Sequence, residues 1–80
     1  MNVRVVLLGQ YRALLPPGAA GDAVTLTFEA AAVPLGDVVR ELRMPAGTGR
    51  IALLDGEAVS DEHLLRDGDL VTFVSPIGGG

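Results

Sequence analysis

Apolar residues along the chain fall into short stretches that alternate with polar residues or run as aliphatic segments, and this pattern predicts β-strands. The stretches are residues 3–8, 24–29, 50–54, 57–59 and 70–75. In the first stretch, alternation places Val6 and Leu8 on the same face as Arg4. Asp55-Gly56, between the third and fourth stretches, is typical of a tight hairpin turn. We expect the first two strands to pair antiparallel.

One stretch follows a helical period instead. Its apolar residues are spaced i, i+3, i+4, i+7 and form a single stripe, consisting of Leu35, Val38, Val39 and Leu42. This spacing predicts a helix over Pro34–Leu42, because proline suits the first turn of a helix. Pro45 and Gly47 are expected to end it.

The remaining segments carry turn signals. Residues 9–21 leave the first strand and contain several prolines and glycines, so they predict a long loop. Residues 61–65 are too short for an independent helix and predict one helical turn, capped by Ser60 or Asp61. Residues 66–69, Arg-Asp-Gly-Asp, predict a second turn before the last strand.

This order of elements predicts an α+β fold, since a single amphipathic helix can cover only one face of a sheet. We expect a β-grasp arrangement, in which a mixed four- to five-stranded sheet packs on one main helix. The first and last strands suit its parallel centre because they are the most continuously apolar. The uncovered face then carries Val6, Leu8 and Val74, which together with Ile77 form a partner-binding surface. The alternative is that these residues are scattered surface hydrophobes.

The last strand runs directly into a glycine tail. We expect a single β-grasp domain over residues 1–77 and a flexible tail over residues 78–80. Gly78, Gly79 and Gly80 lack Cβ atoms, so such a tail can enter a narrow channel. The carboxylate of Gly80 is therefore the candidate reactive group. A frayed terminus or an expression remnant would give the same ending.

Composition excludes most other chemistry. The chain has no cysteine and one histidine, His63, and its carboxylates lie around predicted turns, so we expect no metal site and no cysteine nucleophile. The glycines lack phosphate-loop spacing. We expect a carrier or substrate protein rather than an enzyme, with no bound cofactor.

Charge and hydropathy limit the classes of partner and the cellular location that we expect. A net charge of −4 argues against nucleic acid. No apolar stretch is long enough to span a bilayer, and the N-terminal residues do not resemble a signal peptide, so we expect a cytoplasmic protein. All 6 basic residues are arginine. A GC-rich codon bias explains this, and one consequence is that an activated C-terminus meets no lysine on another copy.

A carboxylate is a poor acyl donor until it becomes an acyl-adenylate, whose phosphate leaves readily. A chain that uses its C-terminal carboxylate must therefore deliver it into a nucleotide-binding pocket on another protein. A rigid domain that docks and a tail without side chains that inserts are what this delivery requires.

Several motifs resemble, in order and spacing, the ubiquitin-like sulfur-carrier family, which includes the small subunit of molybdopterin synthase and the thiamine sulfur carrier. They are Val3–Leu14 with its Q-x-R-x-L segment, Leu54–Glu57 as the V-N-G-E hairpin, Leu65–Val71 as L-x-D-G-D-x-V, and Phe73–Gly80 as F-x-P-P-x-x-G-G. Asp55 replaces the usual asparagine, Ser75 stands where proline is common, and Gly78 occupies a variable position.

The resemblance implies that an E1-like adenylyltransferase uses ATP to adenylate Gly80, which is then converted to a thiocarboxylate. That thiocarboxylate donates sulfur to a biosynthetic enzyme, such as the large subunit of a molybdopterin synthase or a thiazole synthase. Chain length and the long first loop favour molybdopterin, while thiamine, cysteine synthesis and tRNA thiolation stay open. Two other functions stay open as well: a ubiquitin-like modifier conjugated through Gly80, and a non-covalent β-grasp interaction module.

Overall fold

The computed structural model describes residues 1–19, 21–44 and 50–75 of the 80-residue chain. Along these residues the elements are β1 Asn2–Leu7, the 3-10 helix η1 Gly9–Leu14, β2 Ala23–Thr27, β3 Ala32–Pro34, α1 Leu35–Glu41, β4 Ile51–Leu54, β5 Glu57–Val59, β6 Leu64–Arg66 and β7 Leu70–Val74. The first, second, third, fourth and fifth strands expected from the sequence correspond to β1, β2, β4, β5 and β7.

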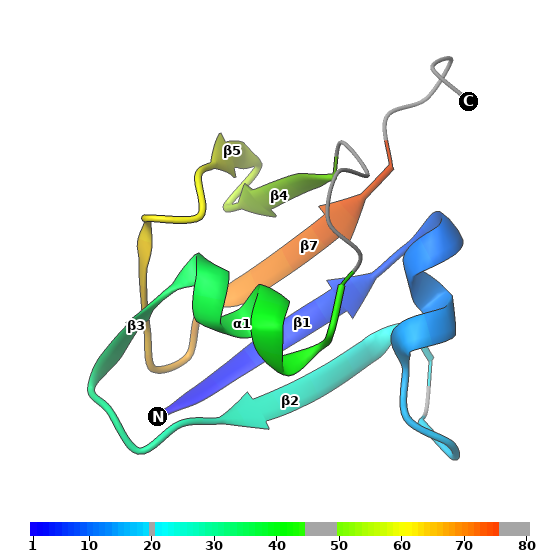
Figure 1. Ribbon diagram of the computed structural model, residues 1–80, viewed down its shortest axis with the longest axis horizontal. Coiled ribbons are helices and arrows are strands. Elements are labelled where there is room, and N and C mark those ends of the chain that lie inside the picture. The colour runs from blue at the N-terminus through cyan, green and yellow to red at the C-terminus, as the bar shows by residue number, and fades with distance from the viewer. Residues whose placement is uncertain (20, 45–49, 76–80) are drawn as a thin grey trace.

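The main sheet has five strands in the order β2-β1-β7-β4-β5, and β3 and β6 form a separate two-stranded sheet (Figure 1). β1 and β7 are parallel neighbours at its centre, with Val5 level with Val71. β2 pairs antiparallel with β1, and β4 pairs antiparallel with both β7 and β5. The predicted mixed sheet and its parallel central pair are confirmed.

The core lies between this sheet and α1, which covers one face of the sheet (Figure 1). Alternate residues of the central strands face it and are fully buried, for example Val5 of β1 and Phe73 of β7. From the predicted helical stripe, Leu35 and Val38 are buried, while the other two members are half-buried and pack at the edge. The core is formed by Val3, Val5, Leu7, Tyr11, Val33, Leu35, Val38, Met44, Ala52, Leu65, Val71 and Phe73. The α+β, β-grasp expectation is therefore confirmed.

The helix is shorter than its apolar stripe predicted. Pro34 ends β3 and is the N-cap of α1 rather than its first helical residue. At the other end, the backbone N–H of Arg43 donates to Arg40 O (3.0 Å) and that of Met44 donates to Val39 O (3.1 Å). This pair of bonds is a Schellman motif, which places Arg43 in the left-handed region at φ 56°. The helix thus ends before Pro45 and Gly47, which lie outside the described residues.

The helical turn expected at residues 61–65 is wrong. Leu64–Arg66 forms β6, which pairs antiparallel with β3, so that Val33 lies opposite Leu65 and both are buried. A hydrogen bond from His63 N to Ser60 O (3.1 Å) closes only one turn before the strand begins. Burial of this apolar pair outweighs the weak local preference of a three-residue segment.

The loop expected over residues 9–21 contains structure as well. Its first part, η1, turns the chain back beside the end of β7 and buries Tyr11, which is 1% exposed. The two predicted turns are confirmed. Asp55 and Gly56 both have positive φ (53° and 83°), as a type I′ hairpin turn requires. In the second, Asp69 N donates to Arg66 O at 3.1 Å.

Candidate functional site

The predicted reactive group lies beyond the described part of the chain. Gly78, Gly79, Gly80 and Ile77 all fall outside the described residues, as does the predicted boundary between domain and tail. The structure does describe the point from which the chain continues towards them. Val74 ends β7 at the centre of the sheet, and Ser75 follows it. We call Ser75 and its surroundings the tail root.

Three segments meet at the tail root. Leu8 N, at the end of β1, donates to Phe73 O of β7 at 3.2 Å. Gly9 follows at φ 59°, a conformation that residues with a side chain adopt at a cost. A Cβ on Gly9 would lie 3.6 Å from Ser75 Oγ, which is an ordinary contact, so the backbone angle rather than crowding favours glycine here. The start of β4 completes the root, since Ile51 lies opposite Val74.

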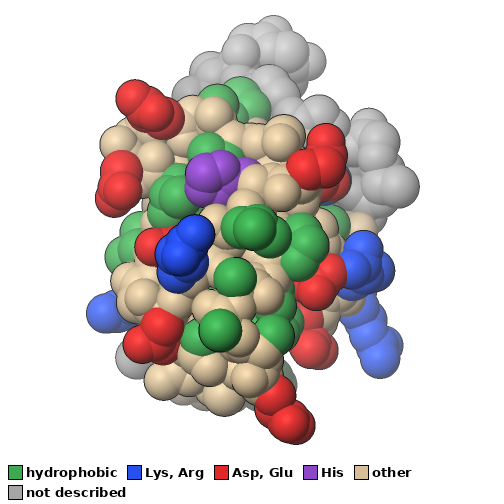
Figure 2. All heavy atoms as spheres, turned by 90° about the vertical axis from the view of Figure 1, so that its left-hand side faces the viewer, with side chains coloured by type: hydrophobic (Ala, Val, Ile, Leu, Met, Phe, Trp, Pro, Cys, Tyr) green, Lys and Arg blue, Asp and Glu red, His purple; other side chains and the backbone are tan. Residues whose placement is uncertain are grey.

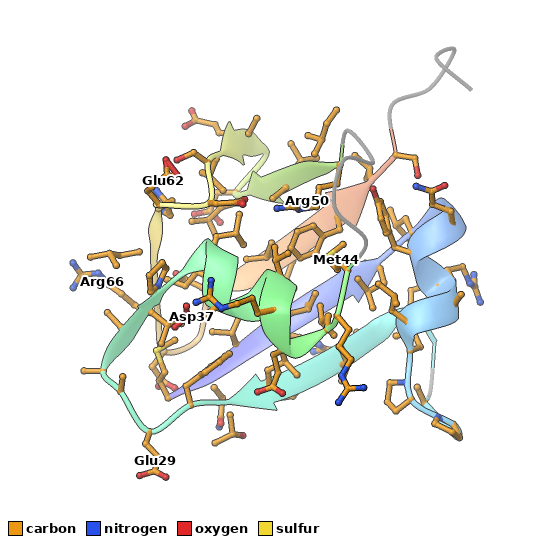
Figure 3. All side chains as sticks on the ribbon, in the orientation of Figure 1. Glu29, Asp37, Met44, Arg50, Glu62 and Arg66 are labelled. Carbon is orange, nitrogen blue, oxygen red and sulfur yellow. The ribbon has the colours of Figure 1, made fainter. Side chains whose placement is uncertain are left out.

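Arg50, the residue before β4, joins the tail root to a distant segment. Its Nη2 donates to Asp61 Oδ2 at 2.7 Å, and its side chain is only 17% exposed. In Figure 3, Arg50 lies within the outline of the molecule, whereas Arg66 points outward. Among the described residues, two buried side-chain atoms lack a hydrogen-bond partner, Arg50 Nε and Ser75 Oγ. Both belong to the tail root, where the register of β4 and β7 makes their residues neighbours.

The face of the sheet opposite α1 carries a group of apolar side chains around Thr72. Val6 lies level with Thr72, which in turn lies opposite Leu53, while Val74 lies opposite Ile51. Residues paired in this way point to the same side of a sheet. We define the open-face patch as Val6, Leu8, Ile51, Leu53, Leu70 and Val74. None of its members packs against the core cluster.

The structure therefore brings Val6, Leu8 and Val74 together, all half-buried. It adds residues that the sequence analysis missed, of which Ile51 and Leu70 are 36% and 44% exposed. Alternation within the predicted strands 50–54 and 70–75 was the signal that could have found them. An apolar surface of this kind on one side of a sheet is typical of a protein-binding site.

One charged side chain lies among the apolar positions of the open face. Arg4 of β1 is exposed and lies level with Leu70 and Thr25. Within the described residues its side chain makes no hydrogen bond or ion pair, unlike Arg12, which pairs with Asp22 at 2.8 Å. The open face thus offers an apolar surface with an unpaired positive charge at one side.

No alternative reaction centre is found in the part of the chain that the structure describes. It contains no cluster of three or more residues of the types that bind metals. The single histidine lies at the surface, with acidic side chains spread around it rather than converging on it (Figure 2). In the same residues, no helix is long and apolar enough to cross a bilayer.

Comparison with known proteins gives a consistent result. Residues 5–80 match the model of the ThiS family. No curated protein matches the chain in a sequence search.

Solved structures with the same fold include SAMP1 from Haloferax volcanii, which is 17% identical, with a TM-score of 0.76 and 100% of both chains covered. A Pyrococcus furiosus protein named as molybdopterin converting factor, subunit 1, is 20% identical, with a TM-score of 0.72 over 95% of this chain and 98% of that one. The thiamine biosynthesis protein ThiS from Geobacter metallireducens is 21% identical, with a TM-score of 0.64 and 100% of both chains covered. At these identities the likeness shows the fold.

Proposed function

Because the chain belongs to the ThiS family of ubiquitin-like sulfur carriers, we propose that it carries sulfur as a thiocarboxylate at Gly80. The observation that carries this proposal is the family match, which begins in β1 and runs through Gly80. The tail root supports it, because the central strand of the sheet leads directly towards those last residues. The lack of cysteine is consistent with it, since the sulfur would be bound to the carboxyl carbon.

The chemistry takes two steps. The carboxylate of Gly80 attacks the α-phosphate of ATP, which gives an acyl-adenylate and releases pyrophosphate. A sulfide sulfur then attacks the acyl carbon, and AMP leaves with the bonding electron pair, so that C–S replaces C–O. Both steps require the nucleotide-binding pocket of a partner, an E1-like adenylyltransferase, and this chain supplies the acyl group and the docking surface.

We propose that the open-face patch is that docking surface. The patch includes Leu70 and Val74 of β7, so a partner bound there contacts the strand that leads to the tail. Burying exposed leucine and isoleucine side chains releases water and favours binding. Arg4 adds a charge without a partner in the described residues, which a carboxylate on the adenylyltransferase would complement. Ile77, which lies outside the described residues, would extend this contact towards the tail.

The sulfur acceptor is a second partner. Chain length and the long connection between β1 and β2 favour the large subunit of a molybdopterin synthase over a thiazole synthase. In this proposal the carrier binds no cofactor of its own, and ATP belongs to the adenylyltransferase.

Mass spectrometry of the intact protein tests the proposal. The chain is incubated with an adenylyltransferase from the same genome, ATP and sulfide, and we expect one oxygen to be replaced by sulfur. A variant lacking Gly79 and Gly80 is the matched control and should keep its mass. An unchanged mass for the full chain, in a reaction where the same enzyme thiolates a second carrier protein used as a positive control, would contradict the proposal.

A further inference from the structure

The basic residues of this chain have a chemical consequence for an activated tail. All 6 are arginines, so residues 1–80 carry no lysine ammonium group. We infer that the chain is an acyl donor whose side chains do not accept acyl groups from its own copies. Its activated C-terminus then forms no amide with a side chain of another copy, and any protein that it modifies receives single copies rather than side-chain-linked chains of copies.

Amide formation requires a neutral amine. The nitrogen lone pair attacks the acyl carbon, the leaving group departs with its bonding electrons, and the nitrogen loses a proton. Lysine has an ordinary pKa about two to three units below that of arginine, so near neutral pH a lysine side chain holds about a hundred to a thousand times more neutral form than an arginine side chain. The lone pairs of a guanidinium are also delocalised over its plane. Arginine therefore keeps the positive charge of a surface without offering a nucleophile.

Four of the arginines are distributed over different elements of the described structure. Arg4 lies on the open face, Arg12 on η1, Arg40 on α1 and Arg66 on β6, and all four are exposed. Arg66 extends away from the body of the molecule (Figure 3). Different sides of the described structure thus carry positive charge, and on each the charged group is a guanidinium.

The remaining amine is that of Met1, which the structure holds in place. Its ammonium is part-buried and donates to Phe28 O at 2.6 Å. This nitrogen lies beside the end of the β1–β2 pairing, which limits the approach of an acyl group to it. Hydroxyl groups attack only when a base removes their proton. In the described residues, no hydrogen bond joins the side chain of His63 to a hydroxyl.

Geometry also prevents the tail from reaching Met1 within one molecule. Since β1 and β7 are parallel and Arg4 lies level with Leu70, Met1 and Ser75 lie at opposite ends of the central pair (Figure 1). At about 3.3 Å per residue their separation along the strands is about 26 Å. Residues 76–80, even fully extended, span at most about 18 Å. Head-to-tail cyclisation of the folded chain is therefore excluded by length.

The test uses a chemically activated chain, so that it does not depend on a partner enzyme. The inference takes from the proposed function only the activation of Gly80, and a thioester at Gly80, made by intein cleavage, supplies this directly. Wild type is compared with Arg66→Lys, which adds one exposed amine and keeps the charge, and with Arg66→Gln, which removes the charge and adds none. Circular dichroism confirms that all three are folded, and hydroxylamine confirms that each thioester is reactive.

We expect wild type and Arg66→Gln to hydrolyse and remain monomeric in mildly alkaline buffer. Arg66→Lys should form covalent dimers at a rate at least about a hundred times that of any dimer formation by wild type, as the difference in neutral nucleophile requires. Dimers or cyclised product from wild type or Arg66→Gln would overturn the inference. So would a monomeric Arg66→Lys whose thioester still reacts with hydroxylamine. Failure of the adenylyltransferase reaction, by contrast, would refute the proposed function and leave this result unchanged.

Discussion

Val5 and Val6 are adjacent in β1 but face opposite sides of the sheet, so the same substitution at each separates stability from docking. Val5 is fully buried against Val71, while Val6 is half-buried in the open-face patch. Replacing either by alanine removes two carbon groups and makes the same small change in strand propensity. Any difference between the two variants therefore reports what each valine side chain contacts.

The magnitudes follow from this burial. At about 0.8 kcal/mol for each buried carbon group, with a further cost for the cavity, Val5→Ala should lower the free energy of unfolding by about 2 to 3 kcal/mol. Val6→Ala should lower it by less than about 1 kcal/mol, because water already reaches that side chain. Binding to the adenylyltransferase should show the opposite order. Loss of about 1 kcal/mol at the interface would raise the Kd of Val6→Ala about fivefold, while folded Val5→Ala binds as wild type does.

Urea unfolding measures the first quantity and isothermal titration calorimetry the second, at a temperature where both variants are folded. Equal losses of unfolding free energy would contradict the two-sided arrangement of β1. An unchanged Kd for Val6→Ala, and also for the double variant with Leu53→Ala, would refute docking through the open-face patch. In that case the tail alone would have to account for recognition.

Other expected outcomes test single features. Arg43→Gly should raise the free energy of unfolding by up to about 1 kcal/mol in urea titrations, because glycine adopts the observed φ of 56° without steric cost; an unchanged midpoint would contradict this account of the helix end. Asp69→Ala should lower the same quantity by about 1 kcal/mol, since Asp69 Oδ2 accepts a hydrogen bond from Arg66 N at 2.9 Å; Asp67→Ala in the same turn, whose Oδ1 accepts from Asn2 N, provides the comparison. Arg4→Glu should slow association with the adenylyltransferase in stopped-flow experiments and weaken its salt dependence, with Arg4→Gln intermediate; equal rates for all three would show that no partner carboxylate lies near Arg4.

The sequence predicted the elements whose pattern repeats over several residues. Strands β1, β2, β4, β5 and β7 were expected because alternation extends far enough to show a period, and the type I′ turn was expected because Asp-Gly is suited to it. β3 and β6 each have only three residues, and they were missed because no hairpin signal indicated them, whereas the Asp-Gly turn after β4 indicated the equally short β5. Their pairing depends on the contact between Val33 and Leu65, which are far apart in the chain. The hydrophobic pattern within a short segment does not predict a contact between residues so far apart.

The end of the helix was also determined by hydrogen bonds rather than by the proline and glycine in the sequence. Pro45 and Gly47, which follow the helix in the sequence, suggested where it should end. The Schellman motif ends it earlier, at Arg43. Burial of Met44, whose N–H makes one of the two hydrogen bonds of the motif and which is 8% exposed, favours this early end. The open-face patch was half predicted for a similar reason. Val6, Leu8 and Val74 were identified from their own strands, whereas Ile51 and Leu53 join them only through the pairing of β4 with β7.

The parallel pairing of β1 with β7 determines when the main sheet can be completed during synthesis of the chain. β1 is synthesised first, but it cannot complete its pairing until β7 has been synthesised, because β7 lies between β1 and β4 in the sheet. Contacts between segments so far apart in the chain form late in folding. A chain that lacks β7 therefore has neither a complete open face nor a tail root, and under the function proposed above it offers an activating enzyme no complete docking surface.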